Sequence, residues 1–169
     1  MHPEYFGDSY DLVKRFFIQE LKAIGYSICV DPMLTGHWNE LEDQFFKLIG
    51  APKTSQSAQA VRRAMFVDPD TGINSKGGKA HVSFQVLAEH ACSNAIVFAF
   101  DQSFSRQHKP KVSMLEKLGQ MHIHGCYGMY YDSHARFLFI SKCQGSLKEF
   151  KAHLVSIGLP ITRLVESAA

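Results

Sequence analysis

The sequence predicts a three-layer α/β fold with a mainly parallel sheet, helices on both of its faces and an antiparallel hairpin near the C-terminus. Two apolar runs, 64–67 and 95–100, end abruptly in Asp68 and Asp101. A short apolar run bounded by turn residues is typical of a strand buried on both faces. Segments of helical periodicity alternate with these runs, which favours parallel strands joined by helices.

The first half of the chain predicts two helices and two strands. Apolar residues at three-to-four spacing indicate a helix over 9–24, which Asp8 or Ser9 caps and Gly25 ends. A strand at 26–30 then stops at Asp31-Pro32, and a second helix spans 40–49. The strand at 64–68 ends before Pro69, because proline disfavours a helical conformation at the residue before it. Asp70-Thr71-Gly72 then predicts a tight turn in which Gly72 takes positive φ.

The second half predicts three helices, a hairpin and two further strands. A helix over 82–91 precedes the strand at 95–100, and a short helix follows at 112–118. Strands at 126–131 and 136–140 flank a four-residue turn, which favours an antiparallel hairpin. Ser146 is the expected cap of the last helix, and 161–165 the expected last strand. The polar segments 74–79 and 102–111 are expected to be exposed and mobile.

Composition indicates one ordinary globular domain over 1–169. The chain is 46% hydrophobic and 20% charged, and its net charge of +2 is too small to indicate a nucleic-acid partner by itself. Its four cysteines form no Cys-x-x-Cys pair, which fits the reducing cytoplasm. No signal-peptide pattern and no run of about 18 apolar residues is present, so no membrane partner is expected.

Acidic residues at the ends of the predicted strands are the best candidates for chemistry. Asp68, Asp70 and Asp101 should meet at the carboxyl edge of the sheet, where open α/β sheets bind ligands. Together they could hold Mg²⁺, or they could orient a base or a ribose hydroxyl by hydrogen bonds. Alternatively, Asp68 and Asp101 only terminate strands and cap the following turns.

Two further segments are candidates. Asp8, Asp11 and Lys14 lie about one helical turn apart and could form one polar face, or they could only cap the helix and form a surface ion pair. In the basic segment after Asp101, Arg106 and Lys109 could bind phosphates, although a solvated loop explains them equally well. His134, in the hairpin turn, could contribute to substrate binding.

The opening Gly7-Asp8-x-x-Asp11-x-x-Lys14 and the strand-ending Asp68-Pro69 resemble motifs of the Rossmann-fold methyltransferases that modify an adenine of ribosomal RNA. The resemblance covers the first half of the chain. It implies a Rossmann-like sheet, a nucleic-acid substrate and S-adenosylmethionine as cofactor. The residues it implies for the cofactor are Asp8, Asp11, Lys14, Asp31 and Gly36, and it implies that Asp68 contacts the target amine.

The sequence departs from that family at two places. Residues 31–36 contain a single glycine, Gly36, where the family has a glycine-rich cofactor loop, and Asp70-Thr71 replaces the Pro-Tyr that follows the catalytic Asp-Pro. The stretch around Asp68-Pro69-Asp70-Thr71-Gly72 also resembles a motif of uncharacterised bacterial proteins. The Asp-x-Asp element is similar to that of metal-dependent nucleases of the topoisomerase-primase type, whose upstream glutamate is replaced here by Asp31.

Three hypotheses follow. The chain is a methyltransferase-like protein with Asp68 at its centre, or a Mg²⁺-dependent nuclease or phosphoesterase that uses Asp68, Asp70 and Asp101. The third hypothesis is a binding module that kept the fold and lost the cofactor loop. Nucleic acid or a nucleotide is the expected partner, and the sequence does not indicate an oligomeric state.

Overall fold

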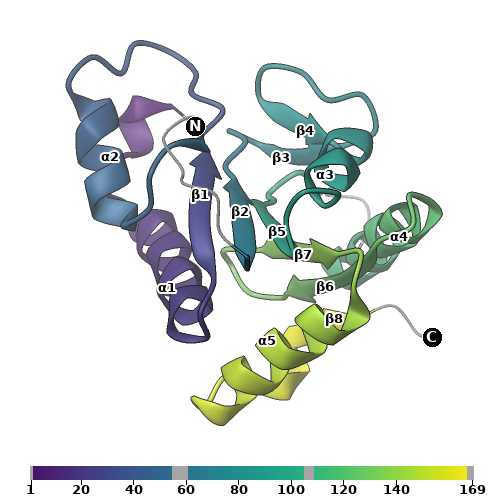
Figure 1. The fold of residues 1–169 in the computed structure, drawn as a ribbon. Helices are drawn as coiled ribbons and strands as arrows, with labels where there is room; N and C mark the ends of the chain where they lie inside the picture. Colours follow the sequence, from purple (N-terminus) through teal and green to yellow (C-terminus); the bar gives the residue numbers. More distant parts are fainter. Residues whose placement is uncertain (1, 55–60, 105–108, 167–169) are drawn as a thin grey trace.

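The computed structural model describes residues 2–54, 61–104 and 109–166 (Figure 1). The helices in this part of the chain are α1 (Ser9–Ala23), α2 (Leu41–Ile49), α3 (Phe84–His90), α4 (Pro110–Ile123) and α5 (Gln144–Ser156). The strands are β1 (Ser27–Asp31), β2 (Arg63–Val67), β3 (Gly72–Asn74), β4 (His81–Ser83), β5 (Ile96–Phe100), β6 (Tyr127–Tyr131), β7 (Phe137–Ser141) and β8 (Leu164–Glu166). None of the described helices has the length and apolar character that crossing a bilayer requires.

Six strands form one mixed sheet in the order β1-β2-β5-β7-β6-β8. The pairs β1–β2 and β2–β5 are parallel, whereas β5–β7, β7–β6 and β6–β8 are antiparallel. The expected mainly parallel, Rossmann-like sheet is therefore not confirmed. The C-terminal hairpin is the cause, because its strand β7, buried at all five residues, pairs directly with β5 in the middle of the sheet.

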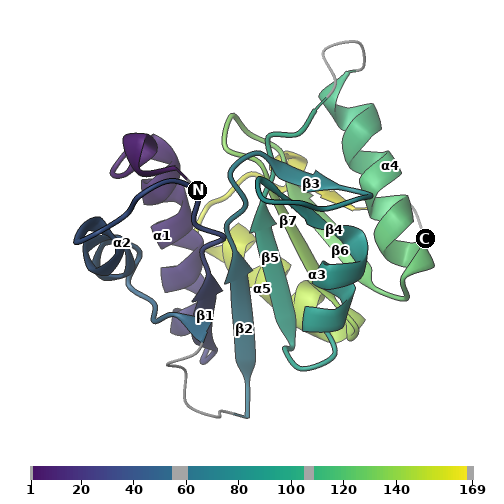
Figure 2. The same cartoon turned by 90° about the horizontal axis from the view of Figure 1, so that it is seen from above.

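Helices pack against both faces of this sheet (Figure 2). On one face, α1, α2 and α5 cover an aromatic core in which Phe66 stacks on Phe98 at 4.8 Å and Phe98 on Phe139 at 5.4 Å between ring centroids. Phe17 of α1 packs on Phe139 at 5.0 Å. On the other face, α3 and α4 cover smaller aliphatic and sulfur-containing side chains. Each of the two faces holds its own polar cluster.

Several boundaries differ from the prediction. Helix α4 is longer than the predicted 112–118, because Pro110 starts it with its fixed φ and its missing N–H suits a first helical position. Ser146 does not cap α5, which begins earlier after Cys143, and it lies inside the first turn. The last strand begins at Leu164, after a 3₁₀ turn at Ile161–Arg163.

A second, two-stranded sheet was not expected. Strand β3 pairs with β4 in parallel, and the segment between them was predicted to be exposed and mobile. Ser75, Lys76, Gly78 and Lys79 are exposed as expected, and Oδ1 of Asn74 accepts hydrogen bonds from the backbone N–H groups of Lys76 and Gly77 at 2.9 and 2.7 Å. An asparagine oxygen that accepts hydrogen bonds from N–H groups two and three residues later stabilises a local turn, so the segment begins with a side-chain-capped turn.

Gly72 takes the positive φ that the turn requires, at +135°. A Cβ at this position would lie only 2.2 Å from Oδ1 of Asp101. Glycine is therefore required here both by backbone conformation and by space.

We expect Gly72→Ala to lower the free energy of unfolding by at least about 3 kcal/mol, since it adds a steric clash to the backbone strain. Gly78 is the matched control, because its φ is +134° and a Cβ there meets nothing within 4 Å. Gly78→Ala should cost only the backbone strain, about 1–2 kcal/mol. Urea unfolding of both variants measures the difference, and equal losses would contradict the close approach of Asp101.

Candidate functional site

Hydrogen bonds at the start of α1 orient the carboxyl group of Asp11. Asp8 caps the helix and accepts hydrogen bonds from the backbone N–H groups of Tyr10 and Asp11. Gly7 has φ +83° and donates its N–H to Oδ2 of Asp11 at 2.8 Å. With Oδ2 held in this way, Oδ1 of Asp11 accepts from Nζ of Lys14 at 2.9 Å. The Gly-Asp-x-x-Asp-x-x-Lys spacing is thus a local hydrogen-bonded unit.

Lys14 joins this unit to the end of β2. Its Nζ lies 2.8 Å from Oδ2 of Asp68, the residue directly after β2. Lys14, Asp11 and Asp68 are all buried. Nζ also lies 5.2 Å from the ring centroid of Phe100 and 5.9 Å from that of Phe45, so two aromatic rings lie beside it.

The buried cluster holds two carboxyl groups and one amine. Burial alone would lower the pKa of Lys14, but the charges of Asp68 and Asp11 outweigh it, and the pKa is raised above 10.5. Burial raises the pKa of Asp68 above 3.8 even though Lys14 opposes the shift. Lys14 is therefore a charged ammonium, and Asp68 is a stronger proton acceptor than an ordinary aspartate.

A cavity of about 260 Å³ opens above this cluster, at the carboxyl ends of β2 and β5. It is lined by Tyr5, Asp8, Tyr10, Lys14, Asp68, Pro69, Asp70, Phe100 and Gln102. The ring of Tyr10 lies 5.3 Å from that of Phe100 and stacks on His134 at 5.4 Å. The Tyr10 hydroxyl and Nε2 of His134 share a hydrogen bond of 2.7 Å. His134 therefore helps to fix the Tyr10 ring, which forms an aromatic wall of the cavity with Phe100.

Three of the residues that the resemblance implies for cofactor binding do not line this cavity: Asp11, which lies beneath it in the buried cluster, Asp31 and Gly36. Asp31 ends β1, and its side chain accepts a hydrogen bond from Met33 N at 3.3 Å, as in a turn cap. Gly36 has φ +77°, and the position of a Cβ there lies 3.2–3.3 Å from the rings of His2 and Pro3. The space that this glycine leaves open is therefore filled by the N-terminal turn.

Asp101 lies at the same edge as Asp68 but on the opposite face of the sheet. Val67 pairs with Ala99, so Asp68 stands beside Phe100, and Asp101 comes one residue later. Because successive side chains of an extended strand point to opposite faces, this offset of one residue directs Asp68 toward α1 and Asp101 toward α4. The prediction that Asp68, Asp70 and Asp101 form one site is therefore wrong.

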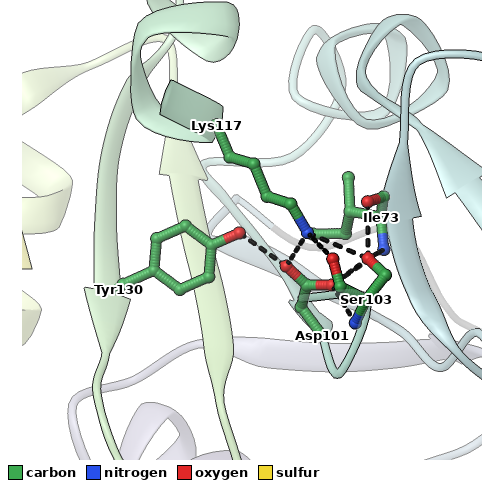
Figure 3. A network of polar contacts seen from close by, with 5 residues as sticks. All are labelled: Ile73, Asp101, Ser103, Lys117 and Tyr130. Carbon is green, nitrogen blue, oxygen red and sulfur yellow. Dashed lines mark hydrogen bonds and ion pairs between the residues drawn. The ribbon is translucent and has the colours of Figure 1, made fainter. Parts of the chain in front are cut away.

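Asp101 belongs to a separate polar cluster (Figure 3). Its Oδ2 accepts hydrogen bonds from Lys117 Nζ and from the Tyr130 hydroxyl, each at 2.7 Å. Its Oδ1 accepts from the Ser103 hydroxyl at 2.6 Å and from the backbone N–H groups of Ile73 and Ser103. Burial lowers the pKa of Lys117, and burial followed by the charge of Asp101 raises the pKa of Tyr130 well above 10.0.

Sequence reasoning missed Lys117, Tyr130 and Ser103 as partners of Asp101. Ser103, two residues after an aspartate that ends a strand, has the spacing of a turn, but Lys117 and Tyr130 are 16 and 29 residues away from Asp101. Only the antiparallel insertion of β7 and the packing of α4 bring them together.

The Mg²⁺ hypothesis requires that the carboxyl groups of three acidic residues lie close enough together to bind one ion. Across residues 2–54, 61–104 and 109–166, no group of three or more His, Cys, Asp or Glu side chains could hold a metal ion. Of the two basic residues expected to bind phosphate, Arg106 lies outside the described residues. Lys109 precedes α4, is exposed, and does not line the cavity.

Comparison of the chain with protein-family models, curated proteins and solved structures found no match.

The buried cluster predicts that removing its cation lowers the free energy of unfolding more than neutralising one of its carboxyl groups does. Lys14→Met removes the ammonium group that lies between two buried carboxyl groups and should lower the free energy of unfolding by about 3–5 kcal/mol. Asp68→Asn should cost less than about 2 kcal/mol, because Lys14 keeps Asp11 and can still donate to the amide oxygen. Urea unfolding at neutral pH measures both changes.

Lys53 provides a control, because its ion pair with Glu42 is partly exposed, with 42% of the Lys53 side chain accessible. Lys53→Met should change the free energy of unfolding by no more than about 1 kcal/mol. If Asp68→Asn were as costly as Lys14→Met, the excess of negative charge in the cluster would be contradicted.

Proposed function

We propose that the cavity above Lys14 and Asp68 binds a nucleobase that carries an exocyclic amine, and that the chain is a methyltransferase-like nucleic-acid-binding protein. The observation that supports this most is the combination of an aromatic wall, Tyr10 and Phe100, with the acidic groups of Asp68 and Asp70 in one cavity. Its position at the carboxyl ends of parallel strands is where α/β sheets bind ligands.

The chemistry of the lining matches such a base. Aromatic side chains stack on the face of any base, which contributes about 1–3 kcal/mol per base. The carboxyl groups of Asp68 and Asp70 can accept hydrogen bonds from an exocyclic amine, while they repel a carbonyl oxygen at the same place.

The size of the cavity limits the ligand. A volume of about 260 Å³ is below the roughly 300–1,000 Å³ of pockets that enclose drug-sized ligands. The cavity therefore suits a single base, whose sugar and phosphate remain at the mouth. It does not suit a base and a second large ligand together.

S-adenosylmethionine does not fit the residues expected to hold it. A Cβ on Gly36 would meet His2 and Pro3, and the Asp31 side chain is used in a turn, while residues 33–36 line a separate hollow of about 400 Å³. We therefore assign no methyl-transfer step to the chain. Recognition of the base, without an assigned cofactor site, corresponds to a degenerate member of the methyltransferase-like type.

The proposal predicts a preference for bases with an amine. Adenosine and cytidine should bind more tightly than inosine and uridine, and Asp68→Asn should weaken adenosine binding by at least about a hundredfold, since a charged acceptor is lost. Tyr10→Leu should weaken it by about ten- to a hundredfold through the lost stacking. Isothermal titration calorimetry of the four nucleosides measures these affinities.

Asp31→Asn is the matched control, because Asp31 lies at the same sheet edge but outside the cavity lining. It should leave adenosine binding unchanged. The proposal fails if adenosine and inosine bind equally well, or if Asp68→Asn remains folded and retains full affinity. Titration with S-adenosylmethionine belongs in the same series, and tight binding would contradict the conclusion that the expected residues do not hold this cofactor.

A further inference from the structure

A second hollow lies beside the proposed base-binding cavity, and one hydrogen bond joins their walls. The hollow has a volume of about 400 Å³ and is lined by Met33, Leu34, Thr35, Gly36, Gly78 and Lys79. Thr35 donates its hydroxyl to Oδ2 of Asp70 at 2.8 Å, and Asp70 lines the cavity. The hollow is therefore the neighbour of the cavity, between the segments that follow β1 and β3.

The linings of the cavity and of the hollow differ in charge. The cavity is lined by three aspartates, Asp8, Asp68 and Asp70, and by one lysine, Lys14. Among the described residues, the lining of the hollow contains Lys79 and no acidic side chain. A phosphate group is therefore disfavoured in the cavity and favoured in the hollow, whereas an amine has the opposite preference.

The backbone around Gly78 adds hydrogen-bond donors to the charge of Lys79. Gly77 and Gly78 have φ of +70° and +134°, and a Cβ on Gly78 would meet nothing within 4 Å. Across residues 2–54, 61–104 and 109–166, no group accepts a hydrogen bond from the N–H of Gly78 or of Lys79. Successive N–H groups in a turn can form a concavity that binds an anion. The hollow thus offers two backbone donors and one ammonium group to a phosphate.

We infer that this hollow binds a phosphate group of the nucleotide whose base occupies the neighbouring cavity. The ammonium group of Lys79 and the N–H groups of Gly78 and Lys79 are its donors. The inference rests on the proposed function and extends the ligand from a nucleoside to a nucleotide. Because the cavity suits a single base, the ribose lies at its mouth and directs the phosphate past the Asp70–Thr35 hydrogen bond. Lys109, which the sequence indicated for phosphate binding, lines neither the cavity nor the hollow.

Calorimetric titration of nucleotides beside the nucleoside tests the inference. Adenosine 5′-monophosphate or adenosine 3′-monophosphate should bind about ten- to a hundredfold more tightly than adenosine, because hydrogen bonds to a charged group are added. The nucleotide that gains affinity identifies the ribose oxygen that carries the phosphate. The gain should shrink at high salt, since Lys79 is exposed and its charge is screened.

Lys79→Gln should remove most of the gain from the phosphate and leave adenosine binding unchanged. Lys109→Gln is the matched control, because it removes an equally exposed lysine that lies outside the hollow. This control variant should keep the gain. Equal losses of affinity in the two variants would show only a general effect of net charge and would overturn the inference.

Inorganic phosphate tests the hollow without a base. In ¹H–¹⁵N NMR spectra of the unmodified chain, phosphate should shift the amide signals of Gly78 and Lys79, and Lys79→Gln should reduce these shifts.

The outcomes separate this inference from the proposed function. Equal binding of adenosine and inosine removes the base site, and the shifts caused by inorganic phosphate then decide the hollow alone: their presence supports a phosphate site and their absence overturns it. Where adenosine is preferred over inosine, the base site stands. The inference is then overturned if neither nucleotide binds more tightly than adenosine, or if Lys79→Gln keeps the gain.

Discussion

The charge of Lys14 holds together the carboxyl edge of the sheet where α1 meets β2. Its ammonium group joins the first turns of α1 to the residue that ends β2, through hydrogen bonds of 2.9 and 2.8 Å to Asp11 and Asp68. Removing a charged partner from a buried ion pair is strongly destabilising, so this ammonium group stabilises both buried carboxyl groups. Lys14 and Asp68 of this cluster also line the cavity above it.

A register offset of one residue explains why the chain has two polar clusters rather than one. Asp68 and Asp101 end neighbouring parallel strands, yet Asp68 stands beside Phe100 and its side chain points to the other face from that of Asp101. Each acid forms an ion pair with a different lysine: Asp68 with Lys14 of α1, and Asp101 with Lys117 of α4. The two faces of one sheet edge thus hold the cavity above Lys14 and Asp68 and a separate polar cluster around Asp101.

Local patterns predicted helices α1 to α5, the strands of the six-stranded sheet and the acids at its edge, but not the small sheet of β3 and β4. Gly25, Pro69 and Gly72 act through backbone preferences that are visible in the sequence, and the spacing of Asp11 and Lys14 already placed them on one helix face. The strand order was not predictable, because β7 has the same apolar pattern whether it lies at an edge or between β5 and β6. The partners of Asp101 depend on that order, so no local signal indicated them.

The central claim is that Lys14 is a buried ammonium shared by Asp11 and Asp68. Nitrogen-15 NMR of the Lys14 side chain tests it most directly. The account predicts slowly exchanging ammonium protons and a pKa above 10.5, so that the stability the cation provides is present at lower pH and is lost as pH rises through that pKa. The Asp68→Asn variant should titrate at a lower pH than the unmodified chain. Rapid proton exchange with water, or titration of Lys14 below 10.5 in the folded protein, would contradict the account.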